Sequence, residues 1–100
     1  MRYLYHSTPY ENLYKILDKG LLPGRDGLIY LCETPQNCNK FLIIRGFVKL
    51  LTVRVKVPKK LENTIIETFD HSEEFFKCRA FASRIPIPLD RIDKFTVWEL

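Results

Sequence analysis

An alternation of apolar and polar side chains over residues 51–57 restricts the fold of this chain more than any other feature. The apolar positions are Leu51, Val53, Val55 and Val57, and the residues between them are Thr52, Arg54 and Lys56. Because successive side chains of a strand point to opposite faces, this period of two predicts a half-exposed β-strand. Pro58 has no N–H to donate to a ladder, so we expect the strand to end there.

Two threonine–proline pairs predict the starts of helices. The segment Thr8-Pro9-Tyr10-Glu11 holds a capping residue, a proline at the first helical position and a glutamate three residues after the cap. Apolar residues then follow at helical spacing: Leu13, Ile16 and Leu17. Gly20 is expected to end this helix with a left-handed residue. Thr34-Pro35 repeats the device and predicts a second helix over residues 35–44, with Gly46 as its breaker.

Short strands are expected around these helices, at residues 2–6, 28–31, 65–66 and 95–99. Residues 72–76 resemble a helix start, and Pro86 and Pro88 exclude a central strand at their position. With 100 residues there is room for one domain, covering residues 1–100. The expected fold class is therefore α+β, a small twisted sheet with two or three helices.

The cysteines, the apolar runs and the net charge restrict the kinds of site and partner that we expect. Three cysteines, Cys32, Cys38 and Cys78, lack paired spacing, so we expect buried or half-buried thiols in a reducing cytoplasm and no metal site. The apolar runs are too short to span a bilayer, and the N-terminus does not have the pattern of a signal peptide, so no membrane association is expected. The net charge of +4 favours approach to a polyanion. The Lys and Arg residues are scattered along the chain, however, and such a distribution also suits a solvated surface.

His6 is the first candidate for chemistry. It stands at the end of the first predicted strand and is followed by two hydroxyl residues, Ser7 and Thr8, and by a predicted helix start. Backbone N–H groups at such a start favour anionic or carbonyl oxygens, and a histidine beside them can hold a ribose hydroxyl. The alternative is a structural histidine, with Thr8 serving as a helix cap.

The same region resembles a known family. Tyr5-His6-Ser7-Thr8, followed by Glu11-Asn12-Leu13, Ile16-Leu17 and Gly20-Leu21, is similar to the opening of ADP-ribosyltransferase-fold proteins. The resemblance is closest to bacterial enzymes that modify DNA bases and to RNA 2′-phosphotransferases. It implies a split twisted sheet and NAD as the cofactor. It also implies that His6 holds the adenosine-side ribose and that the backbone of Ser7, where many members have glycine, holds the nicotinamide amide.

Aromatic residues carry the second part of the resemblance. Tyr30, in Gly27-Leu28-Ile29-Tyr30-Leu31, matches the tyrosine of the family's next strand, and Phe41 follows eleven positions later. In related members a second aromatic on the next helix stacks on the nicotinamide ring, and aromatic faces suit a flat cationic ring. The alternative is that Phe41 belongs to the core face of an amphipathic helix.

A glutamate on a later strand is the third family element, and in that family it stabilises the charge that develops on the ribose. Glu74 is the preferred candidate over Glu73. Arg79, in Cys78-Arg79-Ala80-Phe81, stands where the glutamate is expected and is a candidate to face a phosphate instead. Residues 85–92, beginning Ile85-Pro86, resemble the family's closing segment.

The resemblance implies an enzyme that cleaves the nicotinamide–ribose bond of NAD and transfers ADP-ribose to a protein or nucleic acid. A non-catalytic module that binds NAD, ADP-ribose or a related nucleotide is the second interpretation. A third is RNA 2′-phosphate transfer, which is disfavoured because that family carries an additional N-terminal domain. A structural or inhibitory protein that reuses the fold is the fourth, because a fold does not fix a function.

Overall fold

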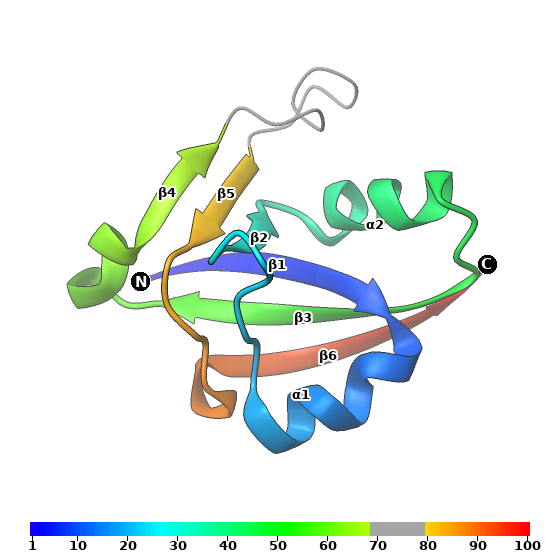
Figure 1. The fold of residues 1–100 in the computed structure, drawn as a ribbon, viewed down its shortest axis with the longest axis horizontal. Coiled ribbons are helices and arrows are strands. Elements are labelled where there is room, and N and C mark those ends of the chain that lie inside the picture. The colour runs from blue at the N-terminus through cyan, green and yellow to red at the C-terminus, as the bar shows by residue number, and fades with distance from the viewer. Residues whose placement is uncertain (69–79) are drawn as a thin grey trace.

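The computed structural model describes residues 1–68 and 80–100, and within them one antiparallel sheet of six strands has the order β4-β5-β2-β1-β3-β6 (Figure 1). The strands are β1 (Arg2–Pro9), β2 (Ile29–Cys32), β3 (Lys49–Val57), β4 (Ile65–Thr68), β5 (Ala80–Ser83) and β6 (Ile92–Glu99). The α-helices are α1 (Leu13–Lys19) and α2 (Pro35–Ile44), and short 3₁₀ turns are η1 (Tyr10–Asn12), η2 (Lys59–Thr64) and η3 (Leu89–Arg91). The predicted α+β class is confirmed. In the described ranges no helix is long and apolar enough to cross a membrane.

The alternation predicted for residues 51–57 is confirmed in β3. Its four apolar side chains are fully buried, whereas Arg54 and Lys56 on the other face are half-buried. Around these side chains lies the hydrophobic core, to which β1, β2, β5, β6, α1 and two connecting segments contribute. Its other buried residues are Leu4, Ile16, Leu21, Ile29, Leu31, Phe81, Ile87 and Ile92. Since Ile16 belongs to α1, this helix covers the buried face of β3.

The first helix begins later than the sequence predicts, and the assignment of Thr8 as its cap is wrong. Thr8 and Pro9 remain in β1, where they pair with Leu51 and Leu50. The Thr8 hydroxyl instead accepts a hydrogen bond of 2.7 Å from the Asn12 amide, and α1 follows after η1. Pairing with the central strand β3 therefore decides the conformation here, and the residue before a proline already disfavours the helical region.

Gly20 ends α1 as predicted, with a φ of 70°. Its backbone lies against the chain after β5, where Leu21 and Ile87 form an isolated bridge. A Cβ at this position would lie 2.3 Å from the Ile87 oxygen. Both the dihedral angle and the close approach thus require glycine.

The second helix has the predicted bounds. The Thr34 hydroxyl accepts a hydrogen bond of 3.2 Å from the Asn37 N–H, which is the bond of an N-terminal cap. Gly46, with a φ of 90°, follows the end of the helix. Because local signals alone fix this helix, the sequence is sufficient to place it.

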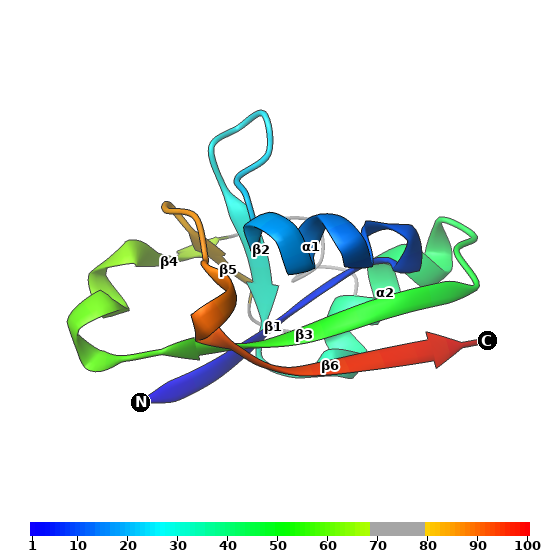
Figure 2. The ribbon, with the colours of Figure 1, turned by 90° about the horizontal axis from the view of Figure 1, so that it is seen from below.

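The sheet opens between β1 and β2. These strands pair at one position, Tyr5 with Cys32, whereas β1 pairs with β3 along its whole length and β2 pairs with β5 along its whole length. Figures 1 and 2 both show β2 running at a steep angle to β1. The two strands expected at residues 2–6 and 28–31 are thus neighbours in the sheet, and beyond their single pair they diverge.

Candidate functional site

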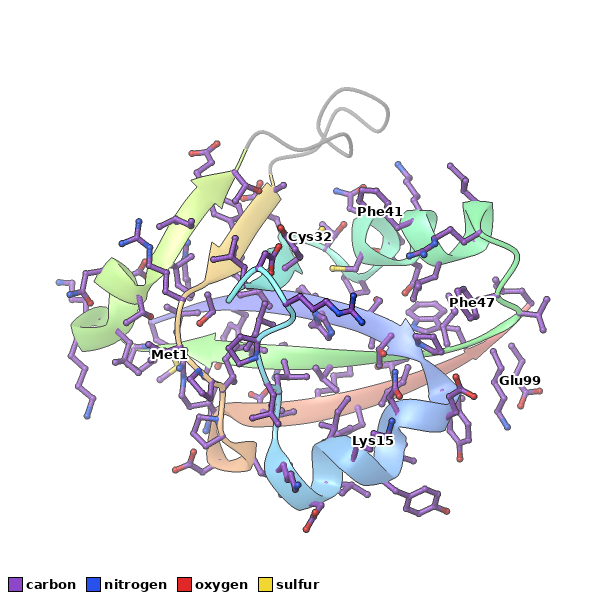
Figure 3. The ribbon with its side chains drawn as sticks, in the orientation of Figure 1. Met1, Lys15, Cys32, Phe41, Phe47 and Glu99 are labelled. Atoms are coloured by element: carbon purple, nitrogen blue, oxygen red, sulfur yellow. The ribbon has the colours of Figure 1, made fainter. Side chains whose placement is uncertain are left out.

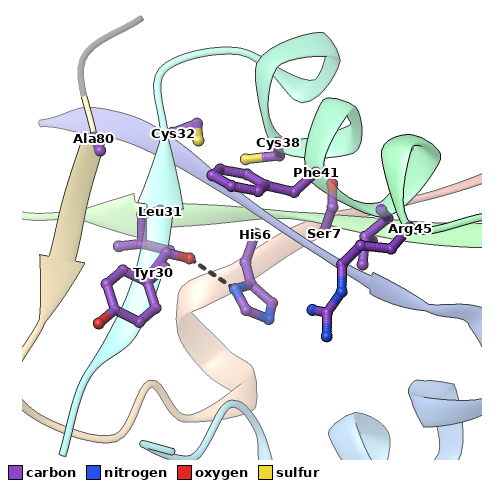
Figure 4. A pocket seen from close by; sticks show the side chains of 10 residues that line it. His6, Ser7, Tyr30, Leu31, Cys32, Cys38, Phe41, Arg45 and Ala80 are labelled. Carbon is purple, nitrogen blue, oxygen red and sulfur yellow. Dashed lines mark hydrogen bonds between the residues drawn. The ribbon is translucent and has the colours of Figure 1, made fainter. Parts of the chain in front are cut away.

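A pocket of about 350 Å³ lies where the sheet opens (Figure 4). Residues of β1, β2, α2 and β5 line it: His6, Ser7, Tyr30, Leu31, Cys32, Cys38, Phe41, Leu42, Arg45 and Ala80. Four residues singled out in the sequence, His6, Ser7, Tyr30 and Phe41, are thus brought to one pocket. Its volume lies within the range usual for small-molecule sites.

His6 projects into the opening between the two strands. Its Nδ1 lies 2.8 Å from the main-chain oxygen of Tyr30. Because a carbonyl oxygen only accepts, Nδ1 carries the hydrogen and the neutral ring presents Nε2 as an acceptor. Desolvation by burial lowers the pKa of His6, and the hydrogen bond to Tyr30 opposes this only in part. The side chain is therefore neutral at pH 7, with one lone pair available to a ligand hydroxyl.

Tyr30 is fixed through its hydroxyl group. The phenol donates a hydrogen bond to Asp26, whose other carboxylate oxygen accepts the Leu28 N–H at 3.0 Å. The bond from Tyr30, followed by that from the Leu28 backbone, lowers the pKa of Asp26. Asp26 was not identified from the sequence, although a carboxylate four residues before a predicted site tyrosine, in a glycine-rich loop, is a usable signal.

The helix α2 supplies the opposite wall. Phe41 and Arg45 are four residues apart, so they share one helix face and both line the pocket. Figure 4 shows the ring of Phe41 near Cys38 of the same helix and Cys32 of β2. The structure therefore places Phe41 on the pocket wall. Arg45 was missed, and its spacing from Phe41 is the signal that identifies it.

The cysteines Cys32 and Cys38 are both buried, as predicted. The Cys38 thiol donates a hydrogen bond of 3.0 Å to the Tyr5 main-chain oxygen. Tyr5 is also the residue with which Cys32 pairs. These contacts hold the first turns of α2 against Tyr5, the residue at which β1 pairs with β2.

A second pocket, of about 480 Å³, lies between His6 and α1. It is lined by His6, Thr8, Asn12, Lys15, Ile16, Asp18, Lys19, Gly20, Leu21 and Leu22. Thr8 thus lines this pocket and not the first one, while His6 lines both. Lys15 and Lys19 are also four residues apart and share one face of α1 (Lys15 is labelled in Figure 3).

The three later candidates, Glu73, Glu74 and Arg79, lie outside the described residues. Within residues 1–68 and 80–100, the first pocket has no carboxylate in its lining and the second has Asp18. The same described ranges contain no group of three His, Cys, Asp or Glu side chains arranged to hold a metal ion. Comparison of the whole chain with protein-family models and with curated proteins finds no match to either.

Proposed function

We propose that the protein binds NAD, cleaves its nicotinamide–ribose bond and transfers ADP-ribose to a protein or nucleic-acid acceptor. One observation carries the proposal: the neutral imidazole of His6 stands between two pockets, with Nδ1 bonded to Tyr30 and Nε2 left as an acceptor. The two halves of NAD are joined by a diphosphate between their riboses, and an acceptor nitrogen between two pockets is placed to bind a hydroxyl group of one ribose.

The first pocket suits the nicotinamide half. Tyr30 and Phe41 offer aromatic faces to a flat cationic ring, by stacking and by cation–π attraction. The neutral state of His6 adds no charge to that of Arg45, which is the cation in the described lining. Leu31 and Leu42 add apolar wall and exclude water, which strengthens the electrostatic interactions that remain.

The second pocket suits the adenosine diphosphate half. Lys15 and Lys19 present two ammonium groups from one face of α1, and a diphosphate is the anionic part of the dinucleotide. The hydroxyl of Thr8 and the amide of Asn12 add polar contacts in the same pocket. Together the two pockets provide room for a ligand that neither holds alone.

In the proposed reaction the C1′–N bond to nicotinamide breaks and the ring leaves with the bonding electrons. A nucleophile of the acceptor forms the new bond to C1′ and loses its proton. Positive charge develops on the ribose between these events, so a carboxylate nearby accelerates the step. Glu74 is the candidate for this carboxylate.

A non-catalytic NAD or ADP-ribose binding module is the second candidate. It is favoured by the lining of the first pocket, in which the described residues include no carboxylate. Such a module uses the same His6, Tyr30 and Phe41 contacts and releases no nicotinamide.

The two candidates are separated by calorimetric titration of NAD followed by mass analysis for released nicotinamide, with protein and nucleic-acid acceptors offered. Binding with release supports the transferase, and binding without release supports the module. Lys15→Ala and Lys19→Ala are expected to weaken NAD binding, while Lys60→Ala, an exposed lysine of η2, serves as the matched control. Absence of NAD binding to the folded wild type overturns both candidates.

A further inference from the structure

A buried polar cluster lies on the face of the sheet that α2 covers. Asn39 Oδ1 accepts hydrogen bonds from the hydroxyl groups of Ser7, at 2.6 Å, and Thr52, at 2.9 Å. Thr52 Oγ1 in turn accepts the indole N–H of Trp98 at 2.9 Å. Asn39 is 5% exposed and Thr52 is 2% exposed, so water does not compete for these bonds.

The bonds fix the orientation of the Asn39 amide. Both hydroxyl hydrogens point to one acceptor, so the oxygen of Asn39 must face Ser7 and Thr52 and its NH₂ group must face away. The two hydroxyl oxygens also lie 2.9 Å apart, which brings all three side chains into one compact group. A buried hydrogen-bonded group of this kind restricts its members to one arrangement.

The cluster joins the two walls of the first pocket. Ser7 belongs to β1 and lines the pocket next to His6, whereas Asn39 belongs to α2, the helix that carries Phe41. Asn39 itself is not in the lining. Together with the bond from Cys38 to Tyr5, its bond to Ser7 therefore connects α2 to β1, on the side of the helix that faces Ser7.

We propose that Asn39 is a positioning residue of the candidate site: by accepting both hydroxyl groups, it holds Ser7 and Phe41 at the separation that a flat aromatic ring requires. The inference rests on the proposed function, because the ring is taken to be nicotinamide. Asn39 acts through Ser7 and α2 and makes no contact with the ligand.

The test compares NAD with ADP-ribose, which lacks the nicotinamide ring. A change in the distance between Ser7 and Phe41 lowers the affinity for NAD and leaves the affinity for ADP-ribose unchanged. A general loss of stability lowers both affinities. Asn39→Leu removes both hydrogen bonds and is expected to lower the ratio of NAD affinity to ADP-ribose affinity about tenfold, which corresponds to about 1.4 kcal/mol. Asn39→Asp keeps an acceptor oxygen, so its ratio of NAD affinity to ADP-ribose affinity should stay close to the wild-type ratio. Asn37→Leu, the same change at a half-buried position on the same helix, should leave it unchanged.

A double-mutant cycle with Ser7→Ala tests whether Asn39 acts through Ser7. If Asn39 acts through Ser7, the combined variant loses no more of the ratio than Asn39→Leu alone. If Asn39→Leu does not fold, Thr52→Val removes one partner of the cluster, and the same ratio is measured in that variant and in Ser7→Ala. A ratio at the wild-type value in the folded variants overturns the positioning role while the wild type still binds NAD. A wild type that binds neither compound overturns the proposed function and this inference with it.

Discussion

The imidazole of His6 donates a hydrogen bond from Nδ1 to the main-chain oxygen of Tyr30, over 2.8 Å, at the point where β1 and β2 stop pairing. The His6 side chain thus bonds to a main-chain oxygen of β2 that would accept a main-chain N–H if the two strands continued to pair. The bond fixes the tautomer of His6 and its position relative to Tyr30.

Replacing His6 with alanine is expected to weaken NAD binding by roughly 1–3 kcal/mol, the cost of leaving hydrogen-bonding groups without partners. Calorimetric titration measures the affinity, and circular dichroism with thermal unfolding shows whether the variant folds. An unchanged affinity in a folded His6→Ala protein contradicts the site assignment.

Acidification is expected to destabilise the protein through His6. Burial lowers the pKa of His6 in the folded state, so the unfolded chain takes up the proton at higher pH. The penalty is absent above the ordinary value of about 6.5 and grows as the pH falls below it, toward the pKa of the folded state. Thermal midpoints between pH 8 and pH 5 should therefore fall more steeply for the wild type than for His6→Gln. Parallel curves for the two proteins would show that His6 does not carry this effect.

Tyr30 is expected to act through both its ring and its hydroxyl group, and two variants separate them. Tyr30→Phe keeps the ring, so NAD affinity should stay closer to wild type than in Tyr30→Ala. The same change removes the main cause of the lowered pKa of Asp26, which should then rise toward its ordinary value. An NMR titration of the Asp26 carboxylate measures this rise, and a pKa that does not move contradicts the bond.

Gly20→Ala is expected to destabilise the fold by about 1–3 kcal/mol, since it forces a side chain into a positive-φ conformation. The added Cβ also meets the Ile87 oxygen at 2.3 Å. Gly24→Ala is the matched control, because its Cβ meets atoms no closer than 3.7 Å and its φ is not in the positive region. Denaturant unfolding compares the two, and equal stabilities contradict the packing of α1 against the segment after β5.

Glu74→Gln is expected to lower the rate of nicotinamide release by about 10²–10³ while leaving NAD binding largely intact, as for the loss of a contact made in the transition state. Glu73→Gln, the same change at the neighbouring position, is the control. Turnover and affinity are measured for both. If both variants release nicotinamide like the wild type, the catalytic group lies elsewhere, and Arg79 is the next residue to test.

The sequence was sufficient where local chemistry decides the structure. Thr34 and Pro35 start α2 where expected because the cap needs only neighbouring residues. The same device failed at Thr8, where pairing with β3 holds the chain extended. The strand β5 was not identified, because all four of its side chains are buried and the strand shows no alternation of apolar and polar residues.

The candidate site was predictable in part for the same reason. His6, Ser7, Tyr30 and Phe41 stand in an order along the chain that resembles a family, so they were found without the fold. Asn39 was not found, because its partners Ser7 and Thr52 lie 32 and 13 residues away in sequence. Only the packing of α2 on the sheet brings them together.

The central place of β1 has a consequence for how the protein is made. β1 is the first strand in the chain, yet it lies between β2 and β3, both of which are synthesised after it. Its strand partners are absent on the ribosome until Cys32 and then the β3 residues from Leu50 to Val57 have emerged, and such distant pairings slow folding. His6 lies in this strand, so the candidate site residue is made before the strands that enclose it and is enclosed only when they pair with β1.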